Sequence, residues 1–158
     1  MRIVAVLDRL APLLRDRTHL LGGAEREALG HLRALAEQFG HRCHILTPSP
    51  VASRLRLGEL RLCGYRDLEE LKQQLRRLRP VVVFSNLDLV YDAAEISRAL
   101  GLPHVPWLDS FECAEPTARE KRRWGVSLDR SYLPADKAAF ALRSSRRVFA
   151  VSRTMKLR

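Results

Sequence analysis

Two groups of residues in this chain could take part in chemistry. The first is a glycine pair, Gly22 and Gly23, directly before an amphipathic helical segment. The backbone N–H groups of such glycines can hold a phosphate at the positive end of a helix dipole. The second is a pair of carboxylates, Asp109 and Glu112, that follow a predicted strand. A carboxylate in that place can act as a general base or hold a substrate hydroxyl.

Each group also has a purely structural interpretation. Glycines before a helix can simply supply the backbone freedom of a turn, and the two carboxylates can cap a helix or bond to a loop. The glycine pair is not part of a GxGxxG sequence, and no GK[ST] follows it. The usual nicotinamide and ATP enzymes are therefore disfavoured.

A third candidate is a basic segment that ends in an aromatic residue. It consists of Arg119, Lys121, Arg122, Arg123 and Trp124. Such a segment can be a solvated helix face, a surface for anionic lipid headgroups, or a stacking platform for nucleic acid. Because no recognised nucleic-acid module accompanies it, lipid or phosphate is the favoured partner.

The histidines, cysteines and serines show no pattern of a metal or nucleophile site. His41 and His44 lie three apart on a predicted strand, so they point to opposite faces, and we predict no metal. The three cysteines lie far apart without a CxxC pair, which is typical of cytosolic proteins. No GxSxG sequence is present, so serine hydrolase chemistry is not indicated.

Composition indicates one globular domain with a preference for anions. The chain has 158 residues, of which 46% are hydrophobic. Its 28 Lys and Arg exceed its 18 Asp and Glu, giving a net charge of +10. This excess favours anionic partners, although solvated basic faces would give the same count. No apolar run is long enough for a transmembrane helix, and the N-terminus is typical of a buried strand rather than a signal peptide.

The candidate residues need an alternating series of strands and helices to position them. Apolar runs predict strands over 2–8, 42–47, 60–63, 81–84, 103–108 and 146–151. Helical periodicity or end signals predict helices over 24–39, 67–78, 88–100 and 136–143. The periodicity puts Phe39 on the buried face of the first helix and Leu68 in the buried leucine stripe of the second, with Asp67 as the N-cap of the second. This alternation predicts an α/β fold with a doubly wound, mostly parallel, Rossmann-like sheet. Ligands bind such sheets beyond the carboxyl ends of the strands.

Four segments resemble the N-terminal domain of glycosyltransferase family 4, whose members have the GT-B fold. Residues 22–47 are similar to its GGxE loop, its helix ending in LAxxxGH and its strand ending in LT. Residues 80–87 (PVVVFSNL), 105–116 (VPWLDSFECAEP) and 148–152 (VFAVS) resemble three later family segments in the same order. The resemblance covers nearly all of the chain.

The resemblance implies that residues 1–158 form the acceptor-binding half of a two-domain sugar transferase. A second domain would carry most contacts to the nucleotide sugar, and nothing in this chain corresponds to it. The whole enzyme would transfer sugar to a lipid-linked or polysaccharide acceptor, with the nucleotide sugar as substrate and with no metal or other cofactor. This half alone is not expected to transfer sugar efficiently, whether it is an excised domain or a naturally short protein.

Site residues carry over from the family by position. Gly22 and Gly23 match the loop that approaches the donor diphosphate, and Glu25 matches its acidic position. Asn86 matches the end of the fourth strand, on the acceptor side. Asp109 and Ser110 stand where the family often has histidine and aspartate, so Asp109 is the candidate base or acceptor anchor. Glu112, close behind, joins Glu25, Asn86 and Ser110 as a candidate acceptor-binding residue.

Two other functions stay open from the residues alone. One is a non-enzymatic α/β module that binds an anion or a partner chain. The other is nucleic-acid binding, which rests on charge alone and is disfavoured. We expect a cytoplasmic protein that associates with the inner membrane face through residues 119–124.

Overall fold

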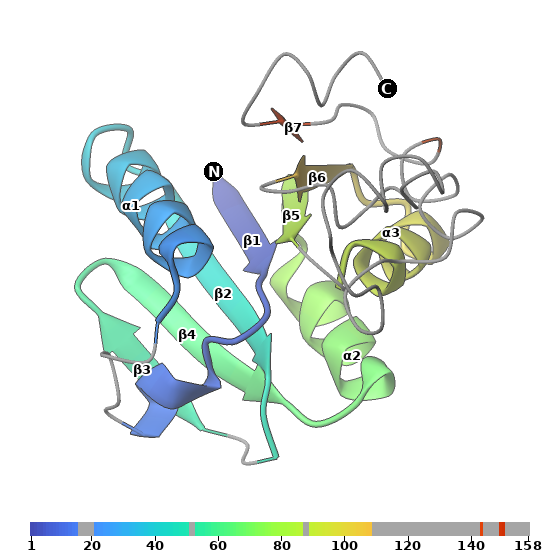
Figure 1. Ribbon diagram of the computed structural model, residues 1–158. Helices are drawn as coiled ribbons and strands as arrows, with labels where there is room; N and C mark the ends of the chain where they lie inside the picture. The colour runs from blue at the N-terminus through green and yellow to red at the C-terminus, as the bar shows by residue number, and fades with distance from the viewer. Residues whose placement is uncertain (16–20, 51–52, 87–88, 109–142, 144–148, 151–158) are drawn as a thin grey trace, which may run out of the picture.

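A seven-stranded sheet forms the centre of the molecule (Figure 1). The computed structural model describes residues 1–15, 21–50, 53–86, 89–108, 143 and 149–150. The strands are β1 (Arg2–Val6), β2 (Arg42–Pro48), β3 (Arg54–Leu57), β4 (Leu60–Tyr65), β5 (Val82–Asn86), β6 (His104–Leu108) and β7 (Phe149–Ala150). The helices are the short 3-10 helix η1 (Ala11–Arg15), α1 (Gly23–Glu37), α2 (Leu68–Leu78) and α3 (Val90–Ala99).

The strand order is that of a doubly wound sheet. Across the sheet it runs β3-β4-β2-β1-β5-β6-β7, and among the described strand pairs only β3 and β4 are antiparallel. The chain moves outward from β1 to β2 and β4, then returns through α2 to β5 on the other side of β1. The point where the order reverses therefore lies between β1 and β5, which is where ligands bind in such sheets.

Strand β1 is buried on both faces because helices cover both sides of the sheet. Ile3 and Ala5 pack with α1 and η1 in one core, whereas Val4 and Val6 pack with α2 and α3 in the other. Figure 1 shows α1 on one side of the sheet and α2 with α3 on the other. The apolar run in the sequence is what a strand between two such layers requires. The predicted α/β, doubly wound, mostly parallel sheet is confirmed.

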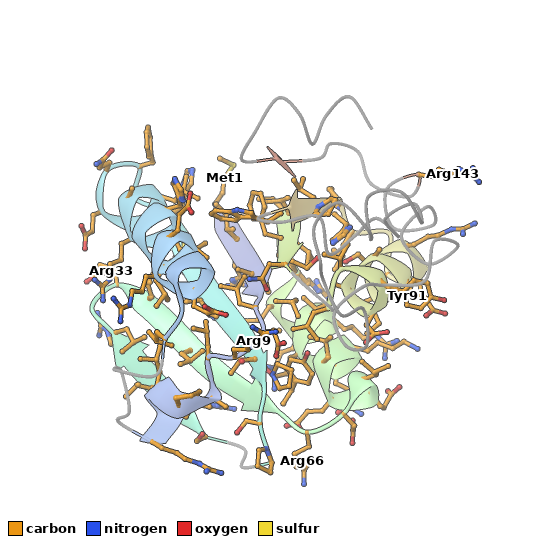
Figure 2. All side chains as sticks on the ribbon, viewed as in Figure 1. Met1, Arg9, Arg33, Arg66, Tyr91 and Arg143 are labelled. Carbon is orange, nitrogen blue, oxygen red and sulfur yellow. The ribbon has the colours of Figure 1, made fainter. Side chains whose placement is uncertain are left out.

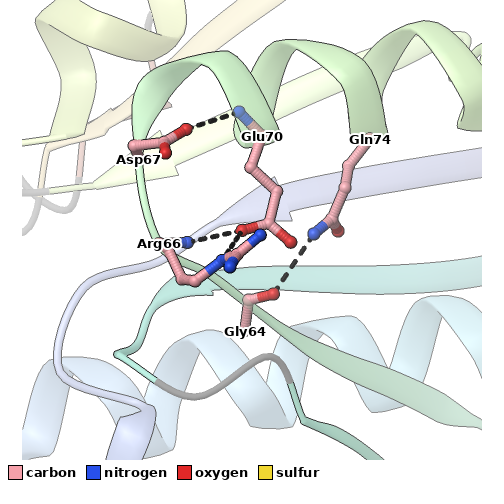
Figure 3. Close-up of polar contacts among 5 residues, drawn as sticks. All are labelled: Gly64, Arg66, Asp67, Glu70 and Gln74. Carbon is pink, nitrogen blue, oxygen red and sulfur yellow. Dashed lines mark hydrogen bonds and ion pairs between the residues drawn. The ribbon is translucent and has the colours of Figure 1, made fainter.

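Helix α2 begins at the predicted cap. The Asp67 Oδ1 atom accepts a hydrogen bond of 2.8 Å from the Glu70 backbone N–H (Figure 3). The Glu70 carboxylate reaches back one residue further than in a standard capping box, because it accepts from the backbone N–H of Arg66 at 2.8 Å. The helix ends at Leu78, and Arg79 adopts a left-handed conformation before Pro80.

Three local predictions are wrong. Strand β3 was not predicted, and it forms a hairpin with β4 through a two-residue loop at Gly58. Phe39 was assigned to the buried face of the first helix, but α1 ends at Glu37 and Phe39 is 64% exposed. Leu68 was assigned to the buried stripe of α2 and is 47% exposed, because it lies in the first turn, beyond the sheet face that Leu71 and Leu75 cover.

Candidate functional site

Side-chain hydrogen bonds hold the loop after β1 against both neighbouring strands, β5 and β2, at the carboxyl edge of the sheet. The Asp8 backbone N–H donates to Asn86 Oδ1 at 3.1 Å, across the reversal point between β1 and β5. On the other side, the Leu10 backbone N–H donates to Thr47 Oγ1 at 3.3 Å. Arg9, which is labelled in Figure 2, lies between these two hydrogen bonds in the sequence and has a φ of 57°. The loop is thus held at the place where the fold predicts a ligand.

Asn86 keeps one free donor in this place. Its side chain is completely buried, and its Nδ2 atom has no hydrogen-bond partner in the described part of the chain. The orientation of the amide is fixed, because the atom that faces the Asp8 N–H must be the oxygen. A buried donor without a partner is costly, so Asn86 Nδ2 is a candidate to donate to an oxygen of a ligand.

Tyr65, at the end of β4, supplies a second such donor. Its side chain is 3% exposed, and its hydroxyl has no partner among the residues that the structure describes. Burial raises the pKa of Tyr65, and the negative charges of Asp92 and Asp8 raise it further. The phenol therefore stays protonated. Like Asn86, it is a donor suited to hydroxyl or phosphate oxygens, but it lies three strands away from β5, in the core that α2 and α3 cover.

The N-terminus of α1 lies at the same edge, with an internal carboxylate close to it. Gly22 is the N-cap residue, and its carbonyl accepts from the Arg26 N–H at 3.2 Å. The Glu25 side chain is 3% exposed and folds back over Gly22, where an added Cβ would overlap its Oε2 atom. Gly23 has nothing within 4 Å of its Cβ position. A phosphate could therefore approach Gly23 without obstruction, whereas the Glu25 carboxylate covers Gly22.

A buried serine and histidine stand behind Asn86. Ser85 Oγ and His104 Nε2 are 2.7 Å apart, and the side chains are 0% and 2% exposed. Burial lowers the pKa of His104 to about 4, so its ring is neutral at physiological pH. The pair joins β5 to β6 and is closed to solvent. It therefore positions the strand that carries Asn86 and does not act as a nucleophile.

Several predicted site residues lie outside the described residues. These are Asp109, Ser110 and Glu112, and the basic segment Arg119, Lys121, Arg122, Arg123 and Trp124. Their roles remain predictions. In the described ranges, no three His, Cys, Asp or Glu side chains gather as a metal site would require. No helix in those ranges is long and apolar enough to cross a membrane.

The site contains residues that the sequence analysis passed over. Tyr65 was not singled out, although a tyrosine at the end of a predicted strand is a polar group at the ligand edge. Ser85 and His104 were not singled out as a pair either. Their pairing could have been found by aligning the two consecutive strands in parallel, because each carries one polar residue on the same face.

Comparison with known proteins bears on the fold. No protein-family model and no curated protein matches this sequence. Among solved structures, a short-chain dehydrogenase/reductase (wide type) from Veillonella parvula DSM 2008, in complex with NADP, aligns with 94% of this chain and 67% of its own, at a TM-score of 0.53 and 13% identity. LpCGTa in complex with UDP aligns with 96% of this chain and 46% of its own, at a TM-score of 0.52 and 15% identity.

The chain thus spans less than half of LpCGTa and about two thirds of the dehydrogenase. At these identities the likeness concerns the fold and not the chemistry. The strand order, the two helical layers and these neighbours agree that the chain has an α/β Rossmann-like fold.

Proposed function

We propose that the chain is the acceptor-side half of a glycosyltransferase that moves a sugar from a nucleotide-sugar donor to a hydroxyl of a lipid-linked or polysaccharide acceptor. The observation that carries the proposal is the buried, unpartnered amide of Asn86 at the reversal point of the sheet. The resemblance of residues 22–47 to the GT-B fold supports it, as does the similarity of the fold to that of UDP-bound LpCGTa.

Different residues at the carboxyl edge contact the acceptor and the donor. Asn86 Nδ2 donates to an acceptor oxygen, and Tyr65 supplies a second protonated donor. Gly23, at the first turn of α1, offers its backbone to the donor diphosphate, where the helix dipole favours negative charge. Glu25 neutralises that helix end while the diphosphate is absent, since its carboxylate folds over Gly22.

The transfer step forms one bond and breaks one. The acceptor hydroxyl oxygen attacks the anomeric carbon, and the bond from that carbon to the β-phosphate oxygen breaks. The nucleoside diphosphate leaves with the bonding electron pair, and the hydroxyl proton passes to a base. Asp109 is the proposed base, on the basis of its place after β6 in the sequence.

The test uses the protein tagged at its N-terminus and purified from its source cells at whatever length it has there. The purified protein is incubated with UDP-, GDP- and ADP-glucose and with a lipid and polysaccharide extract of the source cells as acceptor, and release of nucleoside diphosphate is measured. We expect release with one of them. Asn86→Asp keeps the oxygen that accepts from Asp8 but removes the Nδ2 donor, so it should lower kcat/KM by about 10- to 100-fold.

Ser97→Ala is the matched control. Ser97 is also completely buried, and its hydroxyl also lacks a partner among the described residues, but it lies on α3. It should leave release unchanged. Equal release by the wild type and Asn86→Asp would remove Asn86 from the site. Nucleotide-sugar binding without release would favour the alternative of a non-enzymatic binding module.

A further inference from the structure

A polar hollow lies at the opposite, amino edge of the sheet. It has a volume of about 410 Å³ and lies between the β3–β4 hairpin and the residues that join α1 to β2. Its ionisable lining is almost entirely basic: Arg42, Arg56 and Arg61, with His41 and His44, against the single acid Glu59. A hollow with this lining selects for anions.

The sheet itself places like charges opposite one another in this hollow. His44 of β2 pairs with Arg61 of β4, and Arg61 pairs in turn with Arg56 of β3. The row therefore presents three basic side chains on one face, directly across from each other. Like charges at opposite positions destabilise a sheet unless something neutralises them. Glu59 contacts Arg56 at 3.5 Å, but no ion pair to Arg61 occurs within the described residues.

Helix α2 brings further arginine charge to the same face. Arg77, in the last turn of α2, and Arg61 both lower the pKa of Cys63, although burial has the larger effect and raises it. Arg77 also lines a smaller hollow of about 210 Å³ with Arg54. Glu70 also lines that hollow, and its carboxylate is already bonded to Arg66 at 3.1 Å (Figure 3), so one acid stands against these two arginines.

The wall of the smaller hollow is firmly attached to the sheet. Gln74 of α2 donates through Nε2 to the Gly64 carbonyl of β4 at 3.2 Å, as Figure 3 shows. This bond and the Asp67 cap fix the helix over β4, so that Arg77 is held over the same face as the strand arginines. The basic groups are therefore gathered by the fold and are not side chains on a loose loop.

His44 is the most buried basic side chain in the lining of the larger hollow. Its side chain is only 8% exposed, yet it lines the larger hollow, and the structure gives its ring no hydrogen bond to any described residue. Burial lowers the pKa of His44, and the charges of Arg61, Arg2 and Arg77 lower it further. A bound anion would reverse that electrostatic effect and allow the ring to take up a proton.

We propose that the amino-edge hollow binds a ligand with two or more adjacent phosphate groups, held by Arg61, Arg42 and Arg56 and by His44 at the base. Arginine forks match phosphate oxygens in geometry, and the anion would neutralise the repulsion within the row. The site lies at the opposite end of the strands from Asn86. It therefore does not depend on the proposed transferase activity.

The first test is calorimetric titration of the purified chain with inorganic tripolyphosphate at low ionic strength. Arg61→Gln removes the central charge of the row and should weaken binding about tenfold or more. Arg26→Gln removes the same charge from an exposed position in the first turn of α1, at the other edge, and should bind as the wild type does. Equal affinity of the wild type and Arg61→Gln would overturn the proposal, as would no binding of the wild type to either tripolyphosphate or the anionic vesicles described next.

Two further readouts identify the mode and the source of the phosphates. The ring resonances of His44 should show its pKa rising as tripolyphosphate is added, whereas an unchanged pKa would remove His44 from the site. Vesicles of phosphatidylcholine with phosphatidylglycerol give the second arm. Vesicle binding that Arg61→Gln abolishes, without tripolyphosphate binding, assigns the phosphates to lipid headgroups. The reverse pattern assigns them to a free oligophosphate.

Discussion

Acid should destabilise this domain through one buried side chain, His104. The imidazole is 2% exposed, and its Nε2 atom lies 2.7 Å from Ser85 Oγ in the layer under α3. Burial lowers its pKa in the folded chain from 6.5 to about 4. The unfolded chain therefore takes up a proton at a higher pH than the folded chain does. The neutral ring contributes fully above pH 6.5, and its contribution is lost as the pH falls from 6.5 toward 4.

The size of the effect follows from the two pKa values. A difference of about 2.5 corresponds to about 3 kcal/mol of unfolding free energy once the pH is below both values, at about 1.4 kcal/mol for each unit. Between pH 7.5 and pH 5.0 the loss should be about 2 kcal/mol. Solvent screens the ring little, because it is buried.

Urea unfolding at pH 7.5 and pH 5.0 measures this loss in the wild type and in His104→Gln. The variant cannot gain a ring proton, so its unfolding free energy should fall by about 2 kcal/mol less than that of the wild type over this interval. His41→Gln, outside the core, controls for the removal of a histidine and should behave as the wild type does. Parallel losses in the wild type and His104→Gln would refute the reasoning.

Three further predictions concern stability. Asp67→Ala removes the 2.8 Å hydrogen bond that caps α2 and should lower the free energy of unfolding in urea by about 1 kcal/mol. An unchanged urea midpoint would show that the cap does not stabilise the domain. Leu75→Ala opens a cavity at a completely buried position and should cost about 2–5 kcal/mol, seen as a lower Tm. Gly22→Ala should displace the Glu25 carboxylate and lower the Tm, whereas Gly23→Ala, with open space around it, should stabilise α1 by about 0.5–1 kcal/mol. A higher Tm for Gly22→Ala than for Gly23→Ala would contradict the observed packing around these two glycines.

The central part of the fold could be predicted from the sequence because its signals are redundant. Strand β1 is an unbroken apolar run, and α2 has both a cap and a leucine stripe, so local and tertiary preferences agree. Strand β3 was missed because the stretch that mixes arginine with leucine was predicted to hold a single strand, at 60–63. The two-residue loop at Gly58, between alternating segments, is the hairpin signal that could have revealed it.

The candidate site was harder to predict because burial decides its chemistry. Asn86 was found through the resemblance, but its free amide depends on the Asp8 N–H across the sheet, which no local pattern encodes. Glu25 was found as an acidic loop residue, whereas its fold back over Gly22 depends on how α1 packs. The row of His44, Arg61 and Arg56 arises from strand register, and register was not assigned from the sequence.

The position of β3 also has a consequence for how the protein behaves in concentrated solution. A strand at the border of a sheet offers unpaired backbone groups to any other chain and can start aggregation. Here that border strand has only four residues, and Arg54 and Arg56 are exposed on it. A second molecule approaching in register would bring its own arginines against them. The same charges that suit this edge to phosphate therefore keep the sheet from growing into fibrils.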